Sequence, residues 1–161
     1  MGEYQKASLA EVESAPTPAT AKLELDELFD TTEFGLNVYT VEPGEMAPWG
    51  FHTHPDHEEA FLVCSGELTF ETPDGDYVVG PDEAFFVPPG NGHRAVATGE
   101  EPTRMIAVGA PKDRDHAVIE AECPTCGEVT EQDLDPAPEE ADVLVRTCAE
   151  CDTETLRAGK T

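Results

Sequence analysis

Two groups of side chains in the sequence have the residue types and spacing of metal ligands. The first begins with His52 and His54, has Glu59 after four further residues, and ends with His93 behind a Pro-Pro-Gly turn. Three imidazoles and one carboxylate form a donor set of intermediate softness that accepts most divalent transition metals. The sequence therefore predicts one such site, and Fe, Mn, Ni or Zn are the candidate ions.

The second group contains four of the five cysteines. Cys123-Pro-Thr-Cys126 and Cys148-Ala-Glu-Cys151 are separated by twenty-one residues, which is the spacing of a zinc ribbon with two knuckles. A four-thiolate site has no open coordination position, so we expect a structural zinc ion. A redox role for one pair is the alternative, although neither pair starts a helix in a βαβ context.

The conformation of each knuckle can also be predicted from the residue after its second cysteine. Gly127 and Asp152 occupy equivalent places, and both residue types tolerate a positive φ. The fifth cysteine, Cys64, lies in an apolar run and is expected to be a small buried core residue.

The histidines of the first group need a particular arrangement of strands to meet. His52 and His54 are two residues apart, so on an extended strand both rings point to one face. Glu59 begins the next apolar run, in which Phe61 and Val63 share its face. These residues and a histidine on a later strand converge only if two strand pairs face each other in a closed or nearly closed β-structure.

The chain between residues 34 and 120 has the pattern of such a structure. Short β-like runs alternate with turn residues, and no long amphipathic helix competes with them. The predicted runs are Phe34–Val41, Glu59–Cys64, Glu67–Glu71, Tyr77–Val79, Ala84–Val87, Ala95–Thr98 and Thr103–Val108. The sequence therefore predicts an all-β fold.

The histidine group resembles the two motifs of the cupin superfamily. The first motif consists of HxH, four residues, Glu, six residues and Gly, and the chain matches it from His52 to Gly66. The second motif is matched by Pro88-Pro-Gly90-Asn-Gly-His93. The resemblance implies a small cupin jelly-roll barrel whose His52, His54, Glu59 and His93 hold a divalent metal. The chain departs from the pattern at Asp82, where glycine is usual, and at Ala97, where asparagine is common.

We divide the chain into four parts. Residues 1–33 form a partly irregular N-terminal extension, 34–120 the cupin barrel, 121–155 the zinc ribbon and 156–161 a tail without apolar pattern. Within the ribbon, Glu128–Leu134 and Val143–Arg146 are the β-like stretches. About forty residues bury little core, so zinc would stabilise the ribbon directly.

Several side chains are candidates for the wall of a pocket beside the first metal site. They are Trp49, Phe51, His57, Phe61, Phe86 and Met105, with Phe85 as a further apolar neighbour. Aromatic core packing is the alternative for the rings, and His57 could instead orient a ligand. Arg94 and Arg104 either anchor an anionic substrate or pair with surface acids.

The charge of the chain restricts its partners. Thirty-five acids against nine bases leave a formal net charge of −26, and residues 121–161 hold eleven acids and three bases. Nucleic-acid binding is therefore not expected, because it needs Lys and Arg to neutralise phosphates. Such self-repulsion suits concentrated salt, and the composition resembles that of salt-accumulating halophilic archaea; an ordinary acidic protein is the alternative.

Two functions remain open. The resemblance implies a mononuclear metalloenzyme with dioxygenase, isomerase or lyase chemistry on a small molecule. The alternative is a non-catalytic module that senses a small molecule or a metal and signals to a protein partner through the ribbon. We also expect a homodimer, because cupins often pair and open sheet edges need covering. Without an apolar signal core or membrane span, the chain is expected in the cytoplasm.

Overall fold

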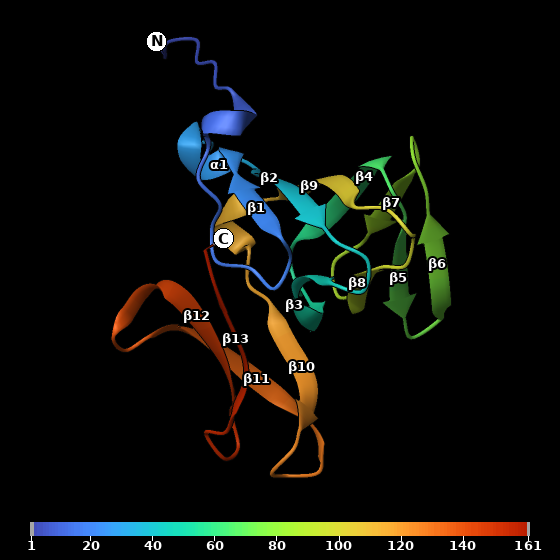
Figure 1. The fold of residues 1–161 in the computed structure, drawn as a ribbon, viewed down its shortest axis with the longest axis vertical. Coiled ribbons are helices and arrows are strands. Elements are labelled where there is room, and N and C mark those ends of the chain that lie inside the picture. Colours follow the sequence, from blue (N-terminus) through green and yellow to red (C-terminus); the bar gives the residue numbers. More distant parts are fainter. Residues whose placement is uncertain (1, 161) are drawn as a thin grey trace.

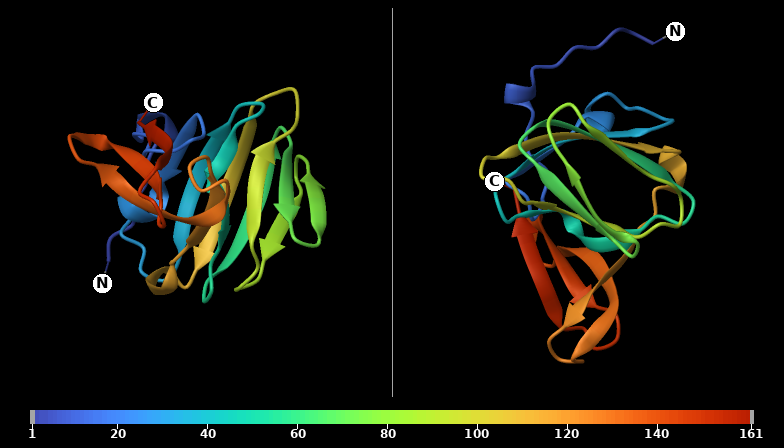
Figure 2. Two further views of the ribbon diagram at one scale, coloured as in Figure 1. Left: turned by 90° about the horizontal axis from the view of Figure 1, so that it is seen from below. Right: turned by 90° about the vertical axis from the view of Figure 1, so that its right-hand side faces the viewer.

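The computed structural model describes residues 2–160 and confirms the all-β prediction, with 53% strand and 6% helix. The strands form two sheets. One has the order β1-β2-β9-β4-β7 and the other β13-β12-β11-β10-β3-β8-β5-β6. The first sheet and the β3-β8-β5-β6 part of the second face each other as a jelly-roll barrel, and β10–β13 extend beyond it (Figures 1 and 2).

The elements have the following bounds. The strands are β1 (Ala21–Glu24), β2 (Gly35–Val41), β3 (Met46–Thr53), β4 (Glu58–Ser65), β5 (Leu68–Thr72), β6 (Gly75–Val79), β7 (Ala84–Val87), β8 (His93–Ala97), β9 (Thr103–Ala110), β10 (Val118–Cys123), β11 (Glu128–Ala137), β12 (Glu140–Cys148) and β13 (Glu154–Gly159). The short helical segments are η1 (Leu9–Glu11), α1 (Leu25–Leu28) and η2 (Lys112–Arg114). All of the sheet pairs are antiparallel.

The core lies between the two facing sheets and follows the alternation of the strands. On β5, Leu68 and Phe70 are fully buried while the residues between and beside them are more exposed. The cluster also contains Tyr39, Val41, Phe61, Val63, Val79, Val87, Met105 and several alanines. This burial closes the barrel and holds the opposing strands at the distance that the histidine group requires.

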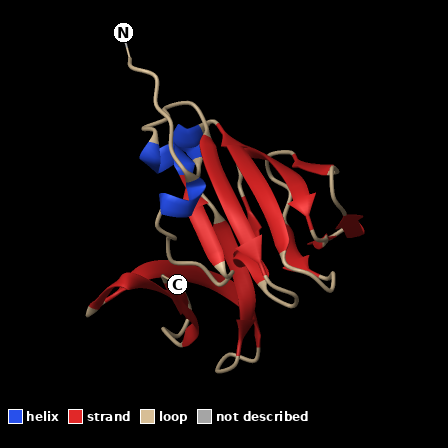
Figure 3. Ribbon diagram, turned by 45° about the horizontal axis from the view of Figure 1, so that its top comes forward, coloured by secondary structure: helices blue, strands red, loops and turns tan. Residues whose placement is uncertain are grey.

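The C-terminal strands continue the barrel sheet instead of forming a separate unit. β10 pairs with β3 through Val118, Ile119 and Glu120, and with β11 from Ile119 to Cys123. The boundary expected at residue 120 therefore falls inside β10. Strands make up most of the molecule, as Figure 3 shows. Residues 156–159, expected in the tail, belong to β13, which lies at the edge of the sheet and pairs only with β12. An edge strand needs no apolar alternation, which explains why the sequence pattern misses it.

Two other expectations change in the structure. Cys64 is exposed, because alternation along β4 turns it to the outer face, away from buried Phe61 and Val63. The N-terminal extension supplies β1, which pairs with β2, so it is more ordered than the sequence suggests. Asp82, where the cupin motif has glycine, takes a φ of 63°, in the left-handed region that glycine adopts readily. No helix in the described residues is long and apolar enough to cross a membrane.

Candidate metal centres

The structure brings the four residues of the histidine group together from both sheets. His52 lies on β3 and His54 follows that strand directly, His93 begins β8, and Glu59 projects from β4 in the opposite sheet. His52 and His93 are register partners in the β3–β8 pair. The predicted convergence across a closed β-structure is therefore what the fold contains.

Glu59 lies at the centre of the group. Its Oε2 lies 3.4 Å from His93 Nε2 and 3.9 Å from His52 Nε2, and its Oε1 lies 3.6 Å from His54 Nε2. The His52 and His93 ring centroids are 4.4 Å apart. All three rings therefore present Nε2 to one carboxylate.

The buried polar atoms of this group fit a divalent cation. His52 donates Nδ1–H to the Gly50 carbonyl at 3.0 Å, and His54 Nδ1 lies 3.1 Å from the His116 carbonyl, which leaves both Nε2 atoms as free lone pairs. His52 Nε2, His93 Nε2 and Glu59 Oε2 are buried and have no hydrogen-bond partner in the described residues. Unpaired buried acceptors are costly, and a cation between them would remove that cost.

Burial determines the protonation of the site. It lowers the pKa of His52 to about 4 and that of His93 to about 3, and neighbouring histidines add to the second effect. Burial also raises the pKa of Glu59. Two neutral imidazoles near neutral pH are the form that binds metals.

Asp115, which lies in the loop before β10, was not among the site residues predicted from the sequence. Its Oδ1 is 3.2 Å from His54 Nδ1. Burial alone would lower the pKa of His54, but the hydrogen bond with Asp115 and the charge of Glu59 outweigh it, so the pKa is raised. Asp115 thus orients the second histidine of the HxH motif from a segment about sixty residues away. Only the folding of that loop against β3 creates the contact.

A cavity of about 420 Å³, here called the His52 cavity, reaches the metal centre from the side of β1, β2 and β10. His52, His54 and Glu59 line its inner part, together with Trp49 and Asp115. Polar residues from the N-terminal half and leucines of the C-terminal sheet complete the wall: Lys22, Glu24, Asn37, Tyr39, Leu134 and Leu144. The cavity is therefore built by all parts of the chain.

The other side chains that the sequence suggested for the pocket wall lie outside the His52 cavity. Phe85 and Phe86 line a second cavity of about 420 Å³ that reaches His93 from the β6 side. His57, Phe61 and Met105 are buried around a small cavity of about 50 Å³ inside the barrel, which Glu59 also borders. Phe51 lies on the opposite face of β3 from His52 and packs on Gly92.

Neither predicted arginine reaches the His52 cavity. Arg94 pairs with Glu71 on the surface, with Nε 2.7 Å from Oε2, and Arg104 is exposed. Lys22, which the sequence analysis did not select, is the cation in the cavity wall. It had no motif to mark it, because β1 was not foreseen.

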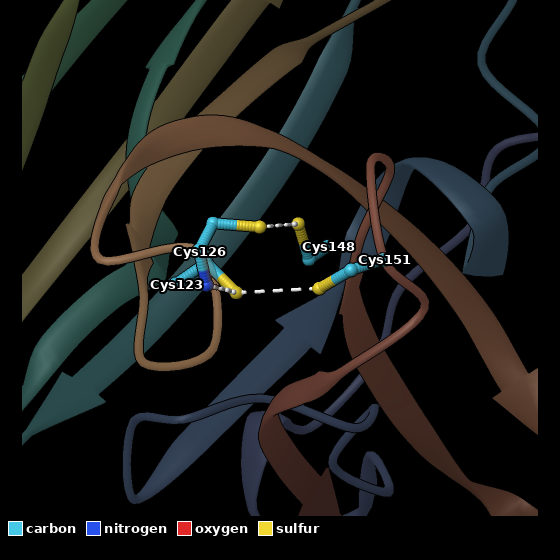
Figure 4. Close-up of side chains that lie close together, drawn as sticks. All are labelled: Cys123, Cys126, Cys148 and Cys151. Atoms are coloured by element: carbon cyan, nitrogen blue, oxygen red, sulfur yellow. Dashed lines mark hydrogen bonds between the residues drawn. The ribbon is translucent and has the colours of Figure 1, made fainter.

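The four cysteines form a second cluster at the far end of the C-terminal sheet (Figure 4). Cys123 Sγ and Cys151 Sγ are 3.6 Å apart, and Cys126 Sγ and Cys148 Sγ are 3.9 Å apart. These separations are too long for disulfides, but they match the edges of roughly 3.8 Å in a tetrahedron with metal–sulfur bonds of about 2.3 Å. The cluster therefore has the dimensions of a tetrahedral thiolate site.

Each cysteine pair lies in a turn of the predicted conformation. Gly127 and Asp152 have φ values of 74° and 57°, and their N–H groups donate to the carbonyls of Cys123 and Cys148. The Thr130 hydroxyl lies 3.1 Å from Cys148 Sγ, and this contact lowers the pKa of Cys148 to about 6. The predicted equivalence of the two knuckles is confirmed.

Comparison with known proteins agrees with this geometry. The sequence profile described as "Cupin domain" matches residues 37–109. The matched residues have the jelly-roll fold of cupins. A glucose-6-phosphate isomerase from Thermococcus kodakarensis is 35% identical to the chain over 71 residues, which is 41% of the chain and 37% of that enzyme. The match therefore spans well under half of the enzyme's length.

Solved structures show the same fold. A sugar phosphate isomerase of the cupin superfamily from Silicibacter pomeroyi superposes with a TM-score of 0.59 at 21% identity, covering 94% of this chain and 92% of that one. A predicted oxalate decarboxylase from Thermotoga maritima has a TM-score of 0.58 at 17% identity, covering 66% and 99%. At these identities the comparison establishes the cupin jelly roll alone.

Proposed function

We propose that the chain is a metal-dependent isomerase of a small phosphorylated sugar. The observation that carries the proposal is the group of unpartnered buried acceptors on His52, Glu59 and His93 beside the His52 cavity. His52, His54, Glu59 and His93 would hold a divalent transition metal. A bound ion supplies Lewis acidity to a substrate oxygen.

Isomerase chemistry is favoured over dioxygenase or lyase chemistry by the character of the cavity and by the relatives. The cavity wall has polar groups suited to a polyhydroxy compound, namely Asn37 and Tyr39, and one cation, Lys22. Two of the similar proteins are named as isomerases of phosphorylated sugars. An aldose–ketose conversion needs a proton moved between neighbouring carbon atoms, which requires a base within the cavity.

Glu59 is the residue we assign to proton transfer, for which its carboxylate would leave the metal. Its carboxylate borders the cavity, and burial brings its pKa closer to neutrality, where a general base works best. The Lys22 ammonium lies 2.6 Å from Glu24 Oε1 and would contact the substrate phosphate. Tyr39 is buried, lines the same cavity, and would orient a hydroxyl group of the substrate.

Elemental analysis and turnover test this proposal together. Protein purified from a salt-rich cytosol without chelators is expected to contain one zinc and one further transition-metal ion per chain. It should interconvert an aldose phosphate and its ketose isomer. Lys22→Gln should raise KM for the phosphorylated sugar about tenfold, which corresponds to ~1.4 kcal/mol, and leave the metal content unchanged. Full activity in protein containing zinc alone at the cysteines would contradict the role of the barrel metal.

We further propose that the four cysteines hold a structural zinc ion. Thiolates are the ligands that zinc takes in closed tetrahedral sites, and Cys123 and Cys148 are completely buried. Cys123→Ser should remove one zinc per chain.

A non-catalytic binding module is the second candidate, and the continuous sheet favours it. Leu134 and Leu144 bring the C-terminal sheet into the cavity wall, so a ligand there would touch the segment that could signal to a protein partner. Ligand binding without turnover of any sugar phosphate, together with altered exchange of amide protons in β11 and β12, would support this function over the isomerase.

The outer face of the five-stranded sheet is the surface we assign to a homodimer. Ala60 lies between Val108 and Phe86, and Leu62 between Ile106 and Ala84, and Leu62, Phe86 and Val108 are exposed. A chain with a net charge of −26 can associate with its own copy only over a face without carboxylates. The patch of Ala60, Leu62, Phe86, Ile106 and Val108 on this face contains no carboxylate, and Glu58 lies beyond its end at the start of β4.

A further inference from the structure

Arg146 on β12 is a buried cation without an acidic partner. Its exposed fraction is 8%, and no carboxylate lies within ion-pair distance of it in residues 2–160. Its guanidinium donates to two uncharged oxygens, the Trp49 carbonyl and the Thr155 hydroxyl. Burying a guanidinium costs several kcal/mol unless its hydrogen bonds compensate. The chain contains thirty-five acids that could pair with a cation, so the position of Arg146 away from the carboxylates of residues 2–160 indicates a specific role for its contacts.

The contact with Trp49 replaces a missing sheet partner. The pairing of β3 with β8 is irregular between Ala47 and His52, and β10 pairs with β3 only from Phe51 onward. The backbone of Trp49 and Gly50 therefore lies in a stretch of β3 without a regular ladder on either side. Arg146 reaches across from β12 and binds the Trp49 carbonyl in that stretch.

Gly50 connects this contact to the metal centre. It has a φ of 135°, and a Cβ on it would lie 2.7 Å from Arg146 Nη1, so only glycine fits there. The Gly50 carbonyl accepts the Nδ1–H of His52, which determines the direction of the His52 ring and frees its Nε2. Arg146 and His52 thus bind the neighbouring carbonyls of one irregular backbone segment.

On its other side Arg146 is linked to the cysteine cluster. Its Nε donates to Thr155 Oγ1 at 3.0 Å, and the Thr155 hydroxyl donates to Gln132 Oε1 at 2.7 Å. Gln132 Nε2 donates to Thr130 Oγ1 at 2.9 Å, and the Thr130 hydroxyl lies 3.1 Å from Cys148 Sγ.

The directions of these hydrogen bonds are compatible with a metal-bound thiolate at Cys148. A metal-bound thiolate can only accept, so it requires the Thr130 hydroxyl as donor, and every link back to Trp49 then has one donor and one acceptor. The same series of hydrogen bonds therefore joins the cysteine cluster to Arg146.

We propose that Arg146 is a positioning residue for His52, and that the cysteine cluster holds Arg146 in place through Thr130, Gln132 and Thr155. The C-terminal sheet is then part of the scaffold of the barrel metal centre. The effect on metal affinity rests on the metal site of the proposed function, whereas the effect on the His52 ring does not.

Manganese binding to the full-length chain tests the proposal. Protein loaded with one equivalent of zinc is titrated with Mn²⁺ in molar KCl, and free Mn²⁺ is measured by electron paramagnetic resonance. Mn²⁺ prefers nitrogen and oxygen donors to thiolates, so it reports on the histidine centre. Arg146→Gln should raise the Kd roughly 10- to 100-fold, as is typical when a residue that orients a ligand is lost. Cys148→Ser should act in the same direction.

Three variants separate positioning from general destabilisation. Arg157→Gln removes the same charge from exposed β13 in the same sheet and should leave the Kd unchanged. Val145→Ala creates a cavity beside Arg146 without touching its contacts, and should lower the melting temperature only. Arg146→Lys keeps the charge and one of the two contacts, so its Kd should lie between those of the unmodified protein and Arg146→Gln.

The imidazole nitrogen resonances of His52, recorded without Mn²⁺, are the second measurement. Arg146→Gln should shift the His52 resonances, and Arg157→Gln should not. If the unmodified protein binds no Mn²⁺, or if His52→Gln/His93→Gln binds it equally well, the metal site of the proposed function is refuted. In that case only the His52 resonances test whether Arg146 positions the His52 ring. Unchanged His52 resonances in Arg146→Gln, or an unchanged Kd in a protein that does bind Mn²⁺, would overturn the inference.

Discussion

The metal-free barrel should lose stability as the pH falls from 7 to 5, because burial keeps two histidine rings neutral in the folded chain while the same rings become protonated in the unfolded chain. Burial lowers the pKa of His52 to about 4 and that of His93 to about 3, whereas unfolded histidine titrates near 6.5. Between these values the unfolded chain binds more protons than the folded chain. The free energy of unfolding therefore falls with decreasing pH throughout this window.

The expected size of the effect follows from those values. At pH 5 an unfolded histidine is almost fully protonated, while both buried rings remain mostly neutral. The loss between pH 7 and pH 5 is about 2 kcal/mol for each ring and ~4 kcal/mol for the pair. His54 acts in the opposite direction, because Asp115 and Glu59 raise its pKa despite burial.

A matched variant isolates the two rings from the many carboxylates. Urea unfolding is measured at both pH values in constant molar KCl, on protein carrying zinc only at the cysteines. His52→Gln/His93→Gln keeps His54, Glu59 and all surface acids, so its loss between pH 7 and 5 should be smaller by ~4 kcal/mol. Equal losses in the two proteins would show that the rings titrate normally, and the buried neutral pair would be refuted. Saturating Mn²⁺ should reduce the loss in the unmodified protein, because the ion binds the neutral rings.

Further predictions concern association, salt and the turn after β4. Leu62→Glu should convert the homodimer to a monomer by light scattering in molar KCl, while Val129→Glu on β11 should not; a monomeric unmodified protein would contradict the dimer. The melting temperature should rise with KCl well beyond physiological strength, because screening weakens the repulsion of a net charge of −26, and an unchanged melting temperature would refute the halophilic interpretation. Gly66→Ala should cost more than ~2 kcal/mol, because φ is 75° and a Cβ would lie 2.5 Å from Thr103 Cα. Gly75→Ala, with φ of 122° and open space, should cost less in the same urea assay.

The local features of both metal centres could be predicted from the sequence, because they depend on short spacings. The two-residue step from His52 to His54 places both rings on one side, and the equivalent residues Gly127 and Asp152 have the positive φ that knuckles need. Alternation of apolar residues also predicted most barrel strands, whereas the grouping of Glu59 with the histidines came from the resemblance to the cupin motifs. The same alternation explains why our expectation of a buried Cys64 is wrong. Phe61 and Val63 face inward on β4, so Cys64 faces outward.

Only the tertiary structure decided how the parts are joined. β10 pairs with β3 and β11 at once, so the ribbon and the barrel share one sheet, and no local pattern records such pairing between distant strands. Asp115 reaches His54, and Arg146 reaches Trp49, across separations of 61 and 97 residues. Short-range periodicity determines which face a side chain occupies, whereas these contacts depend on which strands pair and in which register. For that reason the sequence by itself determined the type of fold and the candidate ligands, and the three-dimensional arrangement decided that the C-terminal strands contact the backbone beside the histidine group.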